Sequence, residues 1–337
     1  MSYWLEGGFG YKPSKPDYRD YHIYNFIRPV ALPEEFSLRS QMGQKPKDQG
    51  QVGACVAYSV SNVMDFFCSR EYDQEYDNSP RFIYSRRPNK PEEGMEPRDA
   101  LSIVGKLGIS REDLCPASVY GKINMNDVCD APDVMEDAAT KRDVKYARFY
   151  TVEELKQAIF QTGPVTIAVP VYRSWSQADY NGIIPPVMSD DVLEGGHMIT
   201  PCGWKIINGF EYIEFENSWW MVPGIEPWGD RGYGWLPVNY EIYEMWALVK
   251  NPGPKPPPPS SCLDEEIKCT TRVMEDDVNY PDLLTKFFGV LDCAWTGVLC
   301  ELGYGDSKVK VDAKKRTATV VRDGYRYVAK VTRSRQR

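Results

Sequence analysis

The spacing of apolar residues changes about halfway along the first 250 residues of the chain. Apolar side chains recur at helical spacing in residues 55–67, 97–107 and 152–160. Because one face of a helix repeats every three to four residues, these stretches predict three helices. Pro97 suits the first turn of the second helix, and Gly163 ends the third.

Beyond residue 164 the pattern becomes one of short β-branched or aromatic stretches separated by turns. These stretches are residues 165–169, 197–204 and 210–215, and each predicts a strand. Helices followed by strands indicate an α+β body with two lobes.

Residues 1–31 are rich in tyrosine, proline and charged side chains, which predicts an extended N-terminal arm. Aromatic side chains such as Tyr11, Tyr18, Tyr21 and Tyr24 offer apolar area for packing on the body. We therefore expect the arm to stay attached to the body. The alternative is that it is a short leader that is cut off.

A proline-rich segment divides the chain. Residues 251–261 contain six prolines, and such a sequence favours an extended, semi-rigid linker. It separates a body of residues 32–250 from a C-terminal module of residues 262–337. In that module, residues 281–302 predict one helix with an apolar face, and residues 308–331 predict three short antiparallel strands.

Charge is distributed unevenly between these parts. The whole chain carries 40 basic and 48 acidic side chains, a net charge of −8, whereas residues 307–337 carry eleven basic and two acidic ones. An acidic body argues against general nucleic-acid binding. The basic segment predicts that the module binds an acidic protein, a nucleic acid or an anionic surface. Docking on the module's own acidic half or on the acidic body is the alternative.

The sequence gives little information about location. Residues 1–6 have neither a basic start nor an apolar stretch, so we expect no secretory signal and synthesis in the cytoplasm, with delivery by a virion or by cell lysis left open. The most apolar stretch, residues 283–302, is interrupted by Lys286 and Asp292 and predicts no membrane span. Nine dispersed cysteines without a signal peptide favour mostly reduced thiols.

Two histidines limit the choice of a general base. His22 lies in the arm, where a surface or packing role is expected. His197 follows two glycines at the start of an apolar stretch. Neither His197 nor Cys55 is diagnostic by itself, because most free cysteines are buried small residues.

Several motifs, however, occur together in a meaningful order. These are Asp48–Ser59 with Gln49 and Cys55, Gly196–His197, Glu216–Trp220, and Trp228–Gly234. In this order the sequence resembles the papain-like cysteine peptidases, and residues 32–39 resemble the start of their mature domain. The separations from Cys55, 142 residues to the histidine and 162 to the asparagine, agree with or slightly exceed the known pattern.

The resemblance implies a two-lobed papain-like fold, with a helical lobe and an antiparallel β-barrel-like lobe, and a peptide or protein substrate. It implies that Cys55 is the nucleophile, activated at a helix start and by the imidazole of His197 as a thiolate–imidazolium pair. Asn217 would orient that imidazole, and Trp219 would shield their hydrogen bond from water. Gln49 would donate to the oxyanion.

Further implications concern substrate and cofactors. The resemblance makes Gly94 the candidate for pairing its backbone with an extended substrate. Val52 stands where many secreted members have a cysteine, and Val56 stands where an aromatic residue is usual. Both differences, and the short leader, are found in microbial and viral relatives. The sequence shows no zinc-type ligand spacing and no phosphate-binding loop, so we expect no metal and no cofactor.

Three classes of function follow. The first is a cysteine endopeptidase that uses Cys55, His197, Asn217 and Gln49. The second is a catalytically silent structural or binding protein that has kept the fold. The third is acyl transfer or peptide ligation through the same thioester chemistry, which the sequence does not separate from hydrolysis.

Overall fold

The computed structural model describes residues 8–43, 45–117, 123–178, 181–219 and 228–250, together with the backbone of five strands between residues 267 and 333. The chain divides into two units, residues 1–253 and 254–337, and each is described by itself.

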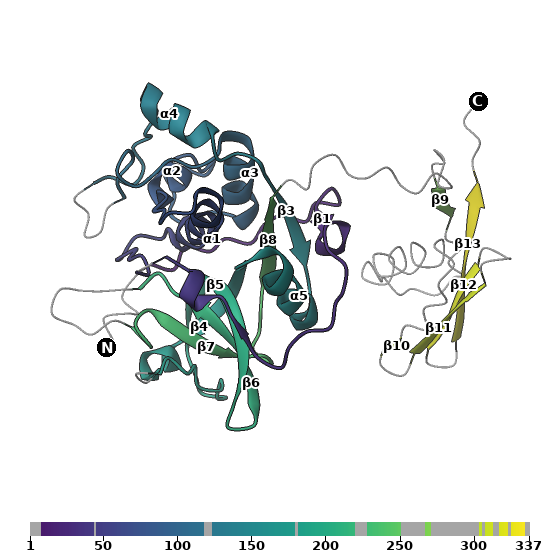
Figure 1. Ribbon diagram of the computed structural model, residues 1–337. Coiled ribbons are helices and arrows are strands. Elements are labelled where there is room, and N and C mark those ends of the chain that lie inside the picture. The colour runs from purple at the N-terminus through teal and green to yellow at the C-terminus, as the bar shows by residue number, and fades with distance from the viewer. Residues whose placement is uncertain are drawn as a thin grey trace. The chain divides into compact units, whose positions relative to one another are not determined.

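The first half of the larger unit is helical. The helices are α1 (Cys55–Tyr72), α2 (Pro80–Tyr84), α3 (Pro97–Leu107) and α4 (Pro132–Ala139). Figure 1 shows α1 at the centre of this lobe, with α2, α3 and α4 around it. The first fourteen of the eighteen residues of α1 are buried, which their mixture of apolar and small polar side chains allows. The predicted helices over 55–67 and 97–107 are confirmed, while the shorter α2 and α4 were not predicted.

The second half is built on one sheet of eight strands, in the order β1-β3-β8-β4-β5-β6-β7, with β2 paired to β5. The strands are β1 (Tyr21–His22), β2 (Phe36–Ser37), β3 (Val144–Phe149), β4 (Thr166–Tyr172), β5 (Leu193–Ile207), β6 (Phe210–Glu216), β7 (Tyr233–Pro237) and β8 (Glu244–Lys250). Helix α5 (Val152–Thr162) covers this sheet (Figure 1) and begins with a capping box between Thr151 and Glu154. Three 3-10 turns complete the unit: η2 (Ile23–Asn25), η3 (Arg39–Gln41) and η4 (Arg173–Gln177).

A hairpin places two of the predicted site residues at the same end of the sheet. Strands β5 and β6 are joined by Asn208 and Gly209, whose φ angles of 52° and 82° suit the type I′ turn that such a pair favours. In the resulting register Thr200 pairs with Glu216. His197 and Asn217 therefore lie close to the same end of the two strands.

The predicted third helix and the strands over 165–169, 197–204 and 210–215 are confirmed as α5, β4, β5 and β6. Strands β3 and β8 were not predicted. The charged residues of β3 obscure the alternation of buried and exposed positions that would predict a strand. Strand β8 becomes apparent only in the folded structure, where it pairs with both β3 and β4 in the centre of the sheet. The α+β fold with two lobes is thus the observed one.

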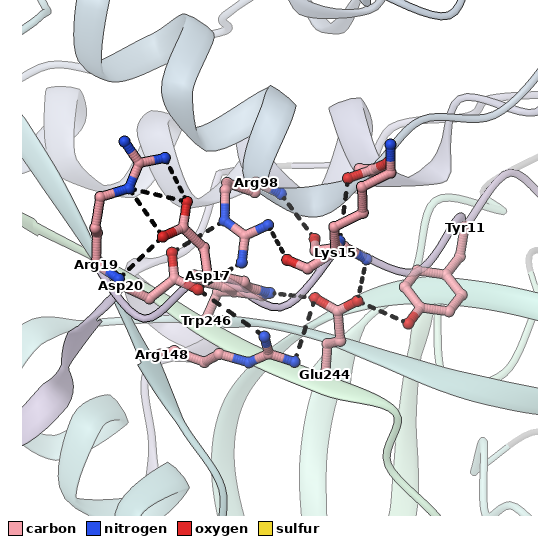
Figure 2. A network of polar contacts seen from close by, with 11 residues as sticks. Tyr11, Lys15, Asp17, Arg19, Asp20, Arg98, Arg148, Glu244 and Trp246 are labelled. Carbon is pink, nitrogen blue, oxygen red and sulfur yellow. Dashed lines mark hydrogen bonds and ion pairs between the residues drawn. The ribbon is translucent and has the colours of Figure 1, made fainter. Parts of the chain in front are cut away.

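The arm is extended, and its aromatic side chains hold it only in part. Tyr11 and Tyr24 pack against the core as expected, whereas Tyr18 is 97% exposed and Tyr21 is 53% exposed. The arm also pairs β1 with β3 and forms an ion pair of 2.5 Å between Asp20 and Arg98 (Figure 2). Whether the arm stays attached in the mature protein remains a prediction.

One pair of cysteines differs from the expectation of mostly reduced thiols. Cys115 and Cys129 form a disulfide, whereas Cys55, Cys68 and Cys202 are free and buried. The disulfide closes a loop of the helical lobe that lies before α4. The side chains of the module's four cysteines lie outside the described residues.

The smaller unit contains a five-stranded antiparallel sheet in the order β10-β11-β12-β13-β9. Its strands are β9 (Ile267–Thr270), β10 (Gly303–Tyr304), β11 (Ser307–Asp312), β12 (Thr317–Arg322) and β13 (Tyr325–Arg333). The three strands expected over 308–331 correspond to β11, β12 and β13, and the helix expected over 281–302 lies outside the described residues. Among the helices that the structure describes, none has the length and apolar character that crossing a membrane requires.

Candidate active site

Cys55 is the first residue of α1, the central helix of the helical lobe. Its side chain is fully buried, and the backbone groups of Met198, Gly10 and Val56 hydrogen-bond the thiol. One of these partners follows His197 directly on β5, and another belongs to the arm. The nucleophile candidate therefore lies where the helical lobe, the sheet lobe and the arm meet.

His197 and Asn217 form the pair that the sequence predicts. The distance between Nε2 of His197 and Oδ1 of Asn217 is 2.8 Å, and both residues are fully buried. The same Oδ1 accepts the backbone N–H of Ser218 at 2.8 Å, which fixes the orientation of the amide. Because an amide oxygen only accepts, Nε2 must carry the proton.

The other nitrogen of the His197 ring is not engaged in this way. Within the part of the chain that the structure describes, Nδ1 of His197 has no hydrogen-bond partner. Trp219 stacks on the imidazole with ring centres 4.5 Å apart and an angle of 23° between the planes. The indole thus lies against the imidazole ring, and its shielding of the His197–Asn217 hydrogen bond stays a prediction.

Gln49 is close to the same residues and all its polar atoms are engaged. Its side-chain oxygen accepts the hydroxyl of Ser218 at 2.5 Å, and its backbone N–H donates to the carbonyl of Ser218 at 2.9 Å. Its Nε2 donates to the carbonyls of Gly8 at 2.6 Å and Val52 at 2.9 Å. The predicted oxyanion donor therefore binds a carbonyl oxygen of the arm.

The arm covers these residues through the segment Gly8–Gly10. The Phe9 ring contacts His197 and Trp219 edge to face, with centres 6.4 Å and 6.2 Å away. Gly10 approaches the nucleophile loop so closely that a Cβ at this position would lie 1.9 Å from the carbonyl oxygen of Gly53. Only a residue without a side chain can lie here.

Gly94 lies beside the arm, but its N–H donates to the Tyr84 phenol at 3.2 Å and its carbonyl accepts the Asn89 amide at 2.9 Å. It has a φ of +78°, and a Cβ there would lie 2.7 Å from the Gly10 carbonyl oxygen. The next residue, Met95, donates its N–H to that oxygen at 2.9 Å, and Lys12 donates its N–H to the Met95 carbonyl at 3.1 Å. The backbone of the arm thus occupies the hydrogen-bonding groups next to Gly94.

Burial shifts the pKa values of the two central groups. Burial raises the pKa of Cys55 to about 11, against the smaller lowering effect of its backbone hydrogen bonds. Burial lowers the pKa of His197 to about 4, although the bond to Asn217 acts in the opposite direction. Both shifts favour the neutral thiol and the neutral imidazole over the expected thiolate–imidazolium pair.

The cavity of about 370 Å³ in the helical lobe lies elsewhere. Its walls include Lys47, Asp65 and Glu112, and it touches the site only through Asp48 and Glu216, the neighbours of Gln49 and Asn217. Among the described residues, no group of three or more His, Cys, Asp or Glu side chains is arranged to hold a metal ion.

A two-lobed α+β fold, with a buried thiol at the start of the central helix and an amide-paired imidazole on the facing sheet, is the architecture of the thiol peptidases related to papain. The family model described as "Papain family cysteine protease" matches residues 32–247. The chain therefore belongs to the papain family of cysteine proteases.

Solved structures share the fold at low sequence identity. Xylellain, a cysteine protease from Xylella fastidiosa, is 22% identical with a TM-score of 0.61, and the match covers 73% of this chain and 97% of that one. Digestive procathepsin L 3 from the larval midgut of Tenebrio molitor is 21% identical, with a TM-score of 0.54 and coverage of 74% and 77%. The procathepsin B from Trypanosoma congolense is 18% identical, with a TM-score of 0.52 and coverage of 73% and 87%.

The sequence reasoning missed the residues that fill the site. Gly8, Phe9 and Gly10 lie in a segment that was predicted to be extended but was assigned no contact with Cys55. An aromatic residue between two glycines, in an arm otherwise rich in proline and charge, was the available signal, since glycine often marks close backbone approach. Ser218, whose hydroxyl holds the Gln49 side chain, lies within the Glu216–Trp220 motif, but the sequence predicted no contact for it.

Proposed function

We propose that this chain is a cysteine peptidase that hydrolyses peptide bonds through a thioester on Cys55. The observation that carries the proposal is the 2.8 Å hydrogen bond between His197 and Asn217, formed beside a buried thiol at the start of α1. The thiolate sulfur attacks the substrate carbonyl carbon, and the C–N bond breaks as the amine takes a proton from the imidazolium. Water then attacks the thioester, which releases the acid and restores the thiol.

His197 suits the role of acid and base because of its tautomer. With Nε2–H donated to Asn217, Nδ1 remains free to take the thiol proton and to return it to the leaving amine. Asn217 is then a positioning residue, because it acts on the substrate only through the ring.

Gln49 is the proposed donor to the oxyanion. Its Nε2 already holds a carbonyl oxygen, that of Gly8, at 2.6 Å. When a substrate replaces the arm, the same N–H can donate to the oxygen on which negative charge develops. Loss of one such donor costs about 3 kcal/mol of transition-state stabilisation.

The seated arm is the proposed resting form of this enzyme. Gly8–Gly10 occupies Gln49, the thiol of Cys55 and the backbone beside Gly94 at the same time. A substrate and the arm cannot bind these groups together. Activity therefore requires the arm to lift or to be removed.

The test is covalent labelling of the full chain by a peptide that carries a thiol-directed epoxide. We expect adduct on Cys55 alone, located by mass spectrometry under conditions that reduce exposed disulfides. Cys68 and Cys202 are internal controls, because both are buried free thiols without an adjacent imidazole. Cleavage of a fluorogenic peptide is measured in parallel.

Matched variants separate the peptidase from a silent fold. Cys55→Ala should abolish both labelling and cleavage, whereas Cys202→Ala should retain both. Absence of adduct on Cys55 at long exposure would refute the proposal and favour a structural or binding role. Adduct formation with ligated rather than hydrolysed product would indicate acyl transfer.

A further inference from the structure

One face of α1 lines the cavity of about 370 Å³ in the helical lobe. Tyr58, Asn62 and Asp65 belong to this lining and recur at helical spacing, so they share one face of the helix. The other walls come from loops of the helical lobe and from Glu216, the last residue of β6. Cavities of this size bind small molecules in many proteins.

The lining of this cavity carries an excess of negative charge. It contains six aspartate or glutamate residues against two lysines. The ammonium group of Lys47 offers three protons, and these have three partners. The partners are Asp65 at 2.6 Å, Asp77 at 2.8 Å and the backbone carbonyl of Asn78 at 2.7 Å. Lys47 therefore does not serve the other carboxylates of the lining.

Three residues of the lining have oxygen atoms with unused capacity to accept hydrogen bonds. Within the described ranges, Oδ1 of Asn62 and Oε2 of Glu112 have no hydrogen-bond partner. Asn62 is only 3% exposed, and the other oxygen of Glu112 accepts the backbone N–H of Ala117 at 2.5 Å. Glu216 is 5% exposed, and its carboxylate, which can accept several hydrogen bonds, accepts the Tyr233 hydroxyl at a long 3.4 Å.

Burial makes these acceptors unfavourable for the chain by itself. A buried oxygen without a hydrogen bond destabilises a protein, and a buried charge without a counter-charge does so more strongly. Burial accordingly raises the pKa of Glu112 to about 7 and the pKa of Glu216 to about 8, from an ordinary value of 4.5. A cation in the cavity would provide both the donors and the opposite charge.

The arrangement of the acceptors decides which kind of cation fits. In the described parts of the chain, no three histidine, cysteine or acidic side chains are grouped to hold a metal ion. A ligand that brings donors to separate points is therefore favoured over a single ion. A primary ammonium group carries one positive charge and three N–H donors. Two such groups on a short flexible chain can serve acceptors on different walls of the cavity.

We propose that this cavity binds a small organic cation with two primary ammonium groups, which Asn62, Glu112 and Glu216 hold by hydrogen bonds. The site lies beside the proposed active site and outside it, because Glu216 directly precedes Asn217 in the chain. It is a second binding site, and its existence does not depend on peptidase activity.

The experiment measures the binding of putrescine, a four-carbon diamine, to the full chain by titration calorimetry. The four-carbon diol, which has a similar length and no charge, is the comparison ligand, and calcium chloride tests a metal ion of the same charge. Every titration contains the same moderate concentration of sodium chloride, so that general screening is constant. Thermal unfolding is the second measurement, since a ligand that binds only the folded chain raises the midpoint temperature.

We expect putrescine to bind saturably, with one molecule per chain, and at least about tenfold more tightly than the diol, because charged donors form the stronger hydrogen bonds. Glu216→Gln keeps the shape of the side chain but removes its charge, and should weaken putrescine binding about tenfold. Asn62→Leu, which removes an acceptor at similar size, should weaken it severalfold. Glu136→Gln is the matched control and should leave the affinity unchanged, since Glu136 is exposed on α4 and lies outside the lining.

Four results would overturn the proposal. No saturable heat up to about 10 mM putrescine, or equal binding of the diamine and the diol, would show that the lining does not select ammonium groups. Saturable binding of calcium without binding of putrescine would assign the cavity to a metal ion. Equal losses in Glu216→Gln and Glu136→Gln would mean that the amine responds to the overall charge of the chain. If Glu216→Gln does not fold, Glu112→Gln and the comparison of ligands on the unmodified chain decide.

Discussion

The two ends of the described arm are attached to the body by different means. The inner segment, residues 8–12, is held by backbone hydrogen bonds to Gln49, Met95 and Gly196 and has glycine where space is least. The outer segment, residues 14–25, is held by side-chain ion pairs and by the pairing of β1 with β3. The inner segment touches the proposed catalytic groups, and the outer segment touches none of them.

The inner segment is thus the part of the arm that blocks the proposed catalytic groups, and the outer segment is the part that anchors the arm to the body. Backbone contacts along residues 8–12 depend on shape and leave little freedom for side chains, as the 1.9 Å limit at Gly10 illustrates. The ion pairs of Asp20 fix the arm at a distance from Cys55 and tolerate more change. Perturbing the two segments should therefore have unequal effects on arm opening, which hydrogen exchange of the arm amides reports.

The largest effect is expected from Gly10→Ala. The added methyl group meets the backbone oxygen of Gly53, which cannot move aside as a side chain could, so the inner segment should lift. We expect hydrogen exchange in residues 8–12 and Cys55 labelling to rise roughly 100-fold. The control is Gly43→Ala, where no atom lies within 4 Å of the added group. Unchanged labelling in Gly10→Ala would contradict blocking by this segment.

Acid should open the arm almost as strongly. Burial holds the pKa of His197 at about 4, below its ordinary value of 6.5, and lifting the arm exposes the ring. The lifted form therefore takes up a proton below about pH 6.5, whereas the seated form does so only near pH 4. The free energy that favours the seated arm is therefore largest above about pH 6.5, and it falls as the pH decreases from there towards about 4. Lowering the pH from about 7 to about 5 should raise the hydrogen exchange that arm opening permits in the arm amides by up to about 30-fold.

The control replaces the other histidine of the chain, which lies in the outer segment of the arm. His22 lies 3.1 Å from Glu154. The variant His22→Asn leaves His197 in place and should keep the opening by acid. Arm exchange that does not change between these pH values in that variant would contradict the assignment to His197.

Asp20→Asn should have a smaller effect on opening. It removes the charge that Arg98 and Arg148 share while leaving the inner contacts intact. We expect exchange in the arm to rise about tenfold, because a hydrogen-bonded charge is lost from a largely buried site. Asp17→Asn is the matched control, since Asp17 pairs with Arg19 of the arm itself. Equal effects of the two variants would show that the outer segment is not an anchor.

The smallest effect is expected from Lys12→Ala. Lys12 pairs with Glu92 at 2.8 Å, but both side chains are exposed to solvent. Exposed ion pairs contribute little, so arm exchange should change by no more than about twofold. A change as large as that of Asp20→Asn would mean that the side chain, and not the backbone, holds the inner segment.

The linear sequence determined the parts of the molecule that repeat or that follow a motif. Helical spacing over Cys55–Phe67 and the β-branched and aromatic stretches around His197 are local properties, so the elements that carry both residues could be predicted. The family motifs likewise identified Gln49 and Asn217, and the structure brings them together with His197 and Trp219.

Other features arise only from contacts between distant segments. The central position of β8, the disulfide between Cys115 and Cys129 and the raised pKa of Cys55 each depend on what packs against them. Tertiary structure overrode local expectation at Tyr18, which is exposed although it is aromatic.

The arm shows this division most clearly. Its composition predicts an extended chain, and that property is local. Only the folded body decides that Gly10 meets Cys55 and that Tyr11 meets Glu244, which is 233 residues away in the chain. No spacing rule connects such positions, because burial, hydrogen bonding and charge at a shared site depend on proximity in space and not on separation in sequence.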